Sequence, residues 1–401
     1  MTQTRTPALW EKLLAILSHV LMFLLAFAVF FSVNANPSSD ISIHATWASE
    51  GDFTDLTSFF HHGAHPMWHV LVSILLHLGL PLSVASPLIT ALCKLAAFAL
   101  IHLLYRRWLK DFPLWSVTLL SLIAAVVSSL CWPPYNPTVY LGAGTPNTWH
   151  SCTQMIAIVW MLLCVPYVAH LYDRFEQLKP SMGAKACLSW KEILLLTFLL
   201  LCSLAAKPTF MQVFLPAACL FFLVQWIRNP RNSRYFLQVL AGVVPAILLM
   251  ILQYMYYFGI IVPSQGDMVL EISLGKVRQT AIMVILMQAF PMYALLITRR
   301  QPKNTLYWLT LVMNLVGIVE FLILGENGRR AADGNFGWGL MAAVLMLWVI
   351  ALPRFVQARR EDVQPTGLRK AGYAAGWLLL GWHLVSGVYY LWYLLSTGAA
   401  L

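Results

Sequence analysis

The chain has 401 residues, of which 60% are hydrophobic and only 10% are charged. A soluble domain carries roughly a quarter charged residues, so this composition excludes a water-soluble protein. The net charge of +10 would suit a nucleic-acid partner, but Lys and Arg cluster in short loops between apolar segments, and no nucleic-acid-binding pattern accompanies them. We therefore expect an all-α, multi-pass protein of the lipid bilayer with no nucleic-acid partner.

Apolar segments of about 18 residues or more recur along the whole chain, as is typical of transmembrane helices. The first is preceded by Arg5 and Lys12 and lacks a convincing cleavage site, so it is interpreted as a retained signal anchor. About eleven spans are predicted, at residues 13–31, 88–105, 114–131, 153–171, 193–206, 210–227, 236–257, 281–297, 306–324, 338–352 and 371–395. They form one transmembrane domain over residues 1–401.

A short apolar segment at residues 68–80 decides the topology. If it crossed the membrane, Arg106, Arg107 and Lys110 would lie outside, against the positive-inside rule, so it is interpreted as a half-buried helix. Of the 26 basic residues, 20 then lie on the cytoplasmic side, five lie outside and Lys94 lies within a span. The protein is predicted to cross the plasma membrane with its N-terminus in the cytoplasm and its C-terminus outside.

The first external loop, residues 33–87, is rich in acids and imidazoles. Asp40 and His44 are four residues apart and would share one face of a helix, where a carboxylate can act as a general base. Its other acids, Glu50, Asp52 and Asp55, are expected only to keep the loop solvated. The motif His61-His-Gly-Ala-His65-Pro66 could suggest zinc, but Gly and Pro break a regular helix there and no HExxH pattern supports it. A structural or substrate-contacting role is preferred for His65, and no metal ligand is assigned.

The second external loop, residues 132–152, is dense in amides, hydroxyls and aromatic rings. Asn147, Trp149 and His150 are of the types that bind sugars through ring faces and hydrogen bonds. A turn-rich connector would use similar residues, which leaves that alternative open. Cys131 and Cys152 flank this loop and could pair, although spacing fixes no connectivity.

Basic residues on the external side run against the charge rule and are candidates for binding a phosphate. Arg329 and Arg330, in the late external loop at residues 325–337 with Asn335, could bind phosphate oxygens through forked hydrogen bonds. Lys207 precedes Pro208 in a tight external turn, and Lys94 is intramembrane, where an ionisable group is a functional candidate. Snorkelling toward the interface is the alternative for Lys207. Together these cations indicate an anionic lipid headgroup as ligand.

This layout resembles the GT-C superfamily of membrane glycosyltransferases. The resemblance lies in a first span followed by an external loop that opens with Asp40, in His65-Pro66 before a short juxtamembrane helix, in Lys207-Pro208, and in the stretch at residues 144–150. It implies transfer of a sugar from a polyprenyl-phosphate carrier to a glycan, lipid or protein acceptor on the outer face, usually with inversion. Asp40 would then be the catalytic acid of the family.

One departure from the family concerns the metal. Many members carry two acids close together at this position, whereas Ser38 and Ser39 precede Asp40. The resemblance therefore assigns no cofactor, and a divalent metal stays an open alternative.

Two other classes of function compete with a transferase. A flippase for lipid-linked sugars or a small-solute transporter would want polar groups along a path at mid-membrane, and no internal repeat typical of duplicated transporters is visible. A non-catalytic assembly subunit would not need an acid together with external cations.

Overall fold

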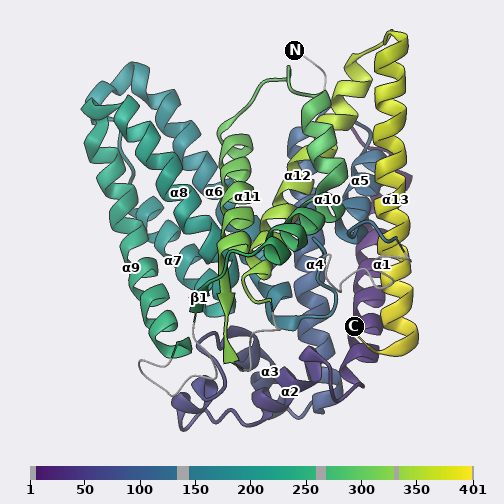
Figure 1. Cartoon of the computed structure of the whole chain (residues 1–401), viewed down its shortest axis with the longest axis vertical. Coiled ribbons are helices and arrows are strands. Elements are labelled where there is room, and N and C mark those ends of the chain that lie inside the picture. The colour runs from purple at the N-terminus through teal and green to yellow at the C-terminus, as the bar shows by residue number, and fades with distance from the viewer. Residues whose placement is uncertain (1–5, 133–143, 259–267, 329–333, 400–401) are drawn as a thin grey trace.

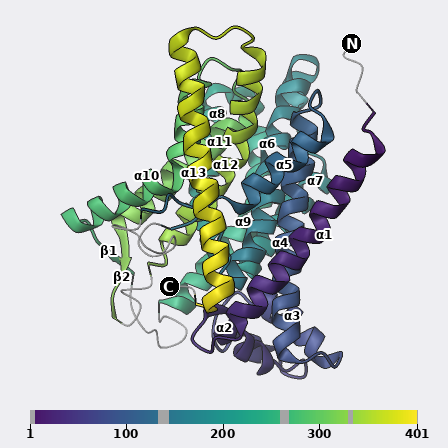
Figure 2. The same cartoon turned by 90° about the vertical axis from the view of Figure 1, so that its right-hand side faces the viewer.

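A computed structural model describes residues 6–132, 144–258, 268–328 and 334–399. In these residues the protein is almost entirely helical, with one small antiparallel ladder between β1 (Met268–Leu270) and β2 (Leu324–Glu326). Figures 1 and 2 show the long helices running between two ends of the molecule. The first long helix begins at one end, and the last long helix ends at the other, beside the short helices of the first loop (Figure 1).

Nine helices among the described residues are long and apolar enough to cross a bilayer, so the chain is a multi-pass membrane protein. They are α1 (Leu9–Asn34), α4 (Leu82–Trp108), α6 (Cys152–Met182), α8 (Pro208–Arg228), α9 (Ser233–Tyr257), α10 (Leu274–Ile297), α11 (Thr305–Ile323), α12 (Gly337–Glu361) and α13 (Gly367–Thr397).

The predicted count of eleven spans is not confirmed. The two remaining predictions fall on α5 (Leu114–Val126) and α7 (Trp190–Ala206), which have 13 and 17 residues. A hydropathy count registers apolar side chains but not where a helix ends. The apolar residues after α5 leave the helix, because Val127 adopts φ −50° and ψ 144°.

The chain beyond α5 stays in the protein interior and finds its hydrogen-bond partners on other helices. Leu130 N donates to Leu286 O (2.8 Å), Nδ1 of His383 bonds Ser128 O (2.6 Å), and Phe290 N donates to Nε2 of His383 (3.3 Å). The carbonyl of Leu286 and the amide of Phe290 flank the non-helical Gln288 of α10, three residues before Pro291. Irregular backbone is tolerated at such depth only when neighbouring helices satisfy it in this way.

The first external loop folds into short helices, as expected. α2 (Asp40–Ser49) begins where Ser39 caps it by accepting a hydrogen bond from Ser42 N. The turn η1 (Leu56–Phe60) and the helix α3 (Met67–His77) follow, and α3 covers most of the half-buried helix predicted at residues 68–80. Trp68 of α3 is fully buried. The two other short turns, η2 (Gly183–Lys185) and η3 (Pro230–Asn232), connect long helices.

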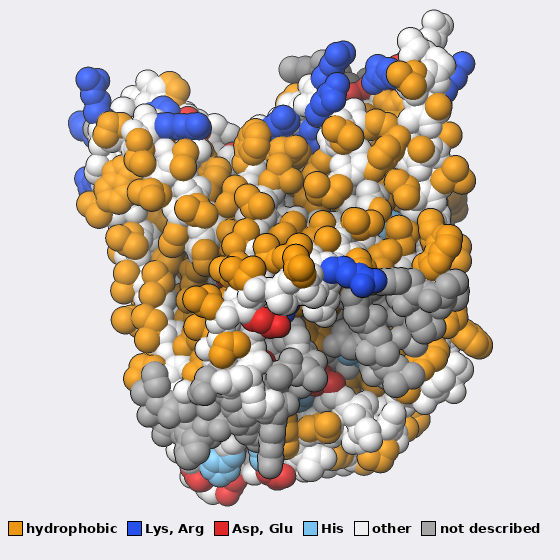
Figure 3. All heavy atoms as spheres, viewed as in Figure 1, with side chains coloured by type: hydrophobic (Ala, Val, Ile, Leu, Met, Phe, Trp, Pro, Cys, Tyr) orange, Lys and Arg blue, Asp and Glu red, His pale blue; other side chains and the backbone are white. Residues whose placement is uncertain are grey.

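The core is centred on α12. In its apolar window 89% of residues are buried inside the protein, compared with 28% for α9, whose flank is left for lipid. The polar ends also differ, since Lys and Arg side chains gather at the end opposite the first loop (Figure 3). This separation agrees with the positive-inside rule, and the orientation in the membrane stays a prediction.

Candidate functional site

A cavity of about 810 Å³ lies between the short helices of the first loop and the ends of the long helices. Asp40, His44 and Trp47 of α2 line one wall, and Lys207 lies in the turn that leads into α8. The other walls come from α8 to α12 and β2, through a mixture of amides, phenols and apolar side chains: Gln212, Gln253, Tyr254, Tyr257, Met283, Phe321, Glu326, Asn335, Trp338 and Met341. Such a cavity suits a ligand with polar and apolar parts.

Asp40 is the first residue of α2, and its carboxylate lies at the wall of the cavity. Its Oδ1 lies 3.5 Å from Nε2 of His44, so the predicted shared helix face is confirmed. The side chain of Asp40 stays 40% exposed, yet its Oδ2 is buried and makes no hydrogen bond among the described residues. A hydrogen bond at the other ring nitrogen orients His44, because its Nδ1 lies 2.8 Å from Nε2 of His69 on α3.

The charge on Asp40 depends on burial and on the basic side chains around it. Burial raises the pKa of the Asp40 carboxyl, but His44, Lys207 and His150 together lower it, and the net result is a pKa well below the usual range. Asp40 is therefore an ionised carboxylate at neutral pH.

Lys207 lines the same cavity from the turn between α7 and α8. It is in extended backbone (φ −171°) before Pro208, the first residue of α8, and its Nζ lies 4.3 Å from the centre of the Trp338 ring. Burial lowers the pKa of Lys207, and the nearby Asp40 opposes that shift. The site thus combines a carboxylate and an amine at one cavity.

His65 also lines the cavity, and its Nδ1 is hydrogen-bonded to the hydroxyl of Tyr257 at the end of α9. The same hydroxyl accepts from Ala64 N (3.1 Å), so α9 holds the loop at this point. Burial lowers the pKa of His65 well below its ordinary value, which keeps the imidazole neutral. A neutral imidazole suits hydrogen bonding to a substrate better than ion pairing.

Three predicted site residues form a buried network away from the cavity lining. Lys94 Nζ donates to Ala125 O (2.8 Å) and to Oδ1 of Asn147 (2.9 Å), and lies 4.1 Å from the centre of the Trp149 ring. Asn147 Nδ2 donates in turn to carbonyls at the end of α5. This network holds the 144–150 segment, and substrate contact by Lys94, Asn147 and Trp149 stays a prediction.

Of the remaining predicted residues that the structure describes, one lines the cavity and one is buried behind its wall. His150 is buried behind the cavity wall, hydrogen-bonded to Tyr390, with its ring 5.5 Å from that of Trp338. Asn335 lines the cavity and donates to Oε2 of Glu326 (2.5 Å). Arg329 and Arg330 lie outside the described residues.

Sequence reasoning missed a polar patch where α9 reaches the cavity. Gln253, Tyr254 and Tyr257 all line it, and Gln253 Nε2 donates to Ala64 O (2.7 Å). The signal was the run of amide and phenol residues at 253–257, but aromatic residues at the end of a span are also typical of a membrane interface. Gln212, which donates to the Tyr254 hydroxyl (3.0 Å), was hidden inside an apolar segment.

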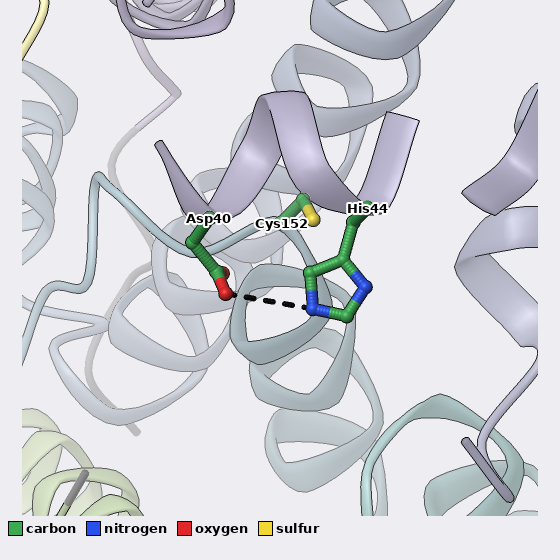
Figure 4. Close-up of side chains that lie close together, drawn as sticks. All are labelled: Asp40, His44 and Cys152. Atoms are coloured by element: carbon green, nitrogen blue, oxygen red, sulfur yellow. Dashed lines mark ion pairs between the residues drawn. The ribbon is translucent and has the colours of Figure 1, made fainter. Parts of the chain in front are cut away.

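One group of side chains beside the cavity has the chemistry of a metal site. Ligand atoms of Asp40, His44 and Cys152 all lie within 4.8 Å of one another (Figure 4). From the sequence, Cys152 was considered only as a partner for Cys131, and no disulfide joins the two in the described residues.

Comparison with known proteins does not name a family. No protein-family model matches the chain, and no curated protein matches it either. The site itself is therefore what indicates a function.

Proposed function

We propose that the protein is a membrane glycosyltransferase of the GT-C type, which moves a sugar from a polyprenyl-phosphate carrier to an acceptor hydroxyl on the extracytoplasmic face. The observation that carries the proposal is the presence of Asp40 and Lys207 at one cavity, beside the short helices of the first loop. A base for the acceptor and a cation for the phosphate are the two charged groups that this reaction needs.

In the reaction, the acceptor oxygen attacks the anomeric carbon of the donor sugar. The new carbon–oxygen bond forms as the bond from that carbon to the phosphate oxygen breaks, and its electron pair leaves with the phosphate. Asp40 takes the proton of the acceptor hydroxyl, and Lys207 stabilises the charge that grows on the leaving phosphate. A single displacement of this kind inverts the anomeric centre.

The cations around Asp40 link donor binding to its strength as a base. In the protein alone, His44 and Lys207 stabilise the carboxylate, which makes it a weak base. A donor phosphate on Lys207 would bring negative charge into a cavity of low dielectric constant and cancel part of that stabilisation. Asp40 would then become a stronger base once the donor is bound.

The lining of the cavity fits the other parts of such a donor. Gln212, Tyr254 and Asn335 offer amide and hydroxyl groups for sugar hydroxyls, and Trp338 offers a ring. Met283 and Phe321 provide apolar surface on the side of α10 and α11, where the first isoprene units would lie.

The replacement Asp40→Asn tests the proposal, because it keeps the shape of the side chain and removes the base. We expect transfer to fall by about a hundred- to ten-thousand-fold, the usual contribution of a general base, with donor binding retained. The assay is sugar transfer from polyprenyl-phosphate donors to extracted envelope glycolipids and glycans in proteoliposomes.

Two loop acids provide matched controls. Asp52 and Asp55 accept hydrogen bonds from Thr54 N and Thr57 N in exposed turns, and neither lines the cavity. Asp52→Asn and Asp55→Asn should therefore transfer at nearly the parental rate. Normal turnover by Asp40→Asn, with loss in one of these controls, would contradict the assignment.

A transporter of lipid-linked sugars or small solutes is the second candidate. The irregular backbone at Gln288 and after α5 favours it, because many transporters form their binding sites at interrupted helices. The two functions differ in product. A transporter would move a doubly labelled donor across the vesicle membrane with its sugar and phosphate still joined, whereas a transferase would separate the labels.

A further inference from the structure

We infer that Asp40, His44 and Cys152 form a binding site for a zinc ion in the wall of the cavity. Each residue offers one ligand atom, and the three atoms lie within 4.8 Å of one another. Figure 4 shows the carboxylate and imidazole projecting from one helix, with the sulfur of Cys152 beside the gap between them. This inference does not depend on which reaction takes place in the cavity.

The separation of Asp40 and His44 is the first argument. Oδ1 and Nε2 are 3.5 Å apart, which is longer than the ~2.7–2.9 Å of a charge-assisted hydrogen bond. Two ligand atoms at about 2.05 Å from a tetrahedral zinc ion lie about 3.4 Å apart. The pair therefore has the spacing of two ligands on one ion rather than that of a tight hydrogen bond.

The second argument is the support behind His44. A histidine that binds a metal through one ring nitrogen usually donates a hydrogen bond from the other, which fixes the ring. His44 directs Nε2 at Asp40, while its Nδ1 lies 2.8 Å from Nε2 of His69. His69 is itself buried, with 5% of its surface exposed, so it can hold the His44 ring in a fixed position.

Cys152 decides which metal the site prefers. It is the first residue of α6, and its side chain is fully buried beside the carboxylate and the imidazole. A ligand set of one sulfur, one imidazole and one carboxylate suits zinc, whereas magnesium, calcium and manganese prefer oxygen ligands. Oδ2 of Asp40, which has no hydrogen-bond partner among the described residues, adds a further acceptor for the cation.

Three protein ligands leave one position of a tetrahedral ion open. Zinc sites of this kind face a cavity, whereas structural zinc sites are closed by four protein ligands. Asp40 and His44 both line the cavity, so the open position can face it. Zinc on Asp40 would also withdraw electron density from the carboxylate, so we expect zinc to slow any transfer in which Asp40 is the base.

The test measures metal binding directly. The full-length protein in detergent micelles is stripped with a chelator and titrated with zinc against a chromophoric competitor, and bound metal is counted by X-ray fluorescence. We expect one zinc ion per chain, and a four-coordinate cobalt derivative with a thiolate-to-cobalt charge-transfer band.

Variants separate this site from other sources of zinc. Cys152→Ser and His44→Gln should weaken zinc binding by on the order of a hundredfold or more, and His69→Gln by about 10–100-fold through loss of support for His44. Cys131→Ser and His62→Gln remove another cysteine and a neighbouring imidazole and leave the three ligands in place, so these variants should bind zinc as the parent does.

Several results would overturn the inference: no zinc uptake by the stripped parent, uptake unchanged in both Cys152→Ser and His44→Gln, or a cobalt spectrum without the thiolate band. If Cys152→Ser fails to fold, the cobalt spectrum of the parent and the binding by His44→Gln decide. Cys152→Ser leaves the Asp40 carboxylate in place. If this variant binds no zinc but still transfers sugar, the proposed function stands independently of the zinc site. Zinc binding by a protein that transfers nothing would leave the zinc site standing.

Discussion

Lys207 and Lys94 are both lysines enclosed by protein, but their amines have different partners. Lys94 donates to Ala125 O and to Asn147, and it does not line the cavity. Lys207 lines the cavity, with the Trp338 ring as its neighbour, and its Nζ makes no hydrogen bond in the described parts of the chain. A lysine whose donors are already used is a structural element, whereas Lys207 can still bind an anion.

We therefore expect Lys207→Met to weaken donor binding by about 1.5–3 kcal/mol, the contribution of a hydrogen bond to a charged group. The measurement is binding of a fluorescent polyprenyl-phosphate sugar, with thermal unfolding of the variant as a check on folding. Lys276→Met is the matched control, because Lys276 pairs with Glu271 and contacts the Phe321 ring without lining the cavity. Equal loss in both variants would indicate a general charge effect rather than a phosphate site.

Lys94→Met should instead affect stability. It removes two hydrogen bonds and leaves Ala125 O and Oδ1 of Asn147 buried without that donor. We expect the free energy of unfolding to fall by about 2–5 kcal/mol, since each stranded polar group costs roughly 1–3 kcal/mol. Unfolding in mixed micelles measures this loss. A variant as stable as the parent, with donor binding lost, would restore the substrate-binding role predicted for Lys94.

At the scale of single residues, the sequence predicts partners that are close along the chain. Asp40 and His44 are four residues apart, and helical geometry brings them to one face. Cys152 lies at the same point but comes from α6, and His69 of α3 supports the His44 ring. No local spacing in the sequence indicates either contact. The zinc alternative that was rejected for the His61–His65 motif considered neighbours in sequence, whereas the proposed ligand cluster is formed by neighbours in space.

Helices are predicted well where an apolar segment continues as one helix, and poorly where backbone geometry changes within it. α12 and α13 contain the predicted spans, but α5 stops at Val126, and Gln288 interrupts α10 with φ −135°. A proline in the sequence does not always mark such a break. Pro291 follows Gln288, whereas α8 continues through Pro216. The partners that stabilise the breaks, such as His383, come from distant helices.

The contact between the first loop and α9 gives a prediction about elements. Ala64 N and Nδ1 of His65 share the hydroxyl of Tyr257. Tyr257→Phe removes both bonds, so amide exchange in residues 58–66 should accelerate by roughly tenfold, which corresponds to about one hydrogen bond of local stability. Hydrogen–deuterium exchange with peptide resolution measures it, and α2 should keep the parental rate.

Tyr254→Phe is the control for this prediction, since its hydroxyl accepts from Gln212 within the helix bundle and not from the loop. An unchanged rate at residues 58–66 in Tyr257→Phe would mean that the other contacts of α9 hold the loop, namely Gln253, which donates to Ala64 O, and the hydroxyl of Tyr256, which donates to Phe60 O. Faster exchange in both variants would indicate loosening of α9 as a whole.

For the whole molecule, composition and charge pattern were sufficient to predict a multi-pass helical membrane protein. The low charged fraction excluded a soluble fold, and the half-buried helix at residues 68–80 was predicted from the positions of Arg106, Arg107 and Lys110. The cavity could not be predicted in this manner, because its walls come from segments that are up to 300 residues apart, from Asp40 to Met341. Their convergence depends on how the helices pack.

The orientation of the molecule is the last prediction. Basic side chains gather at the end opposite α2 and α3 (Figure 3), so the cavity and its carboxylate should face the outside of the cell. The measurement is labelling of single introduced cysteines by a membrane-impermeant maleimide in intact cells. The background variant replaces Cys187, Cys202 and Cys219 with serine and keeps the buried Cys152.

Thr54→Cys, on an exposed turn of the first loop, should react in intact cells. Lys110→Cys and Val363→Cys, both exposed at the opposite end, should react only after the membrane is permeabilised. The physical reason is the cost of carrying 20 of the 26 basic residues across the bilayer if the orientation were reversed. Labelling of Lys110→Cys from outside, with Thr54→Cys protected, would show that the orientation in the membrane is the reverse. The cavity would then face the cytoplasm, where a donor on the outer leaflet could not reach Asp40.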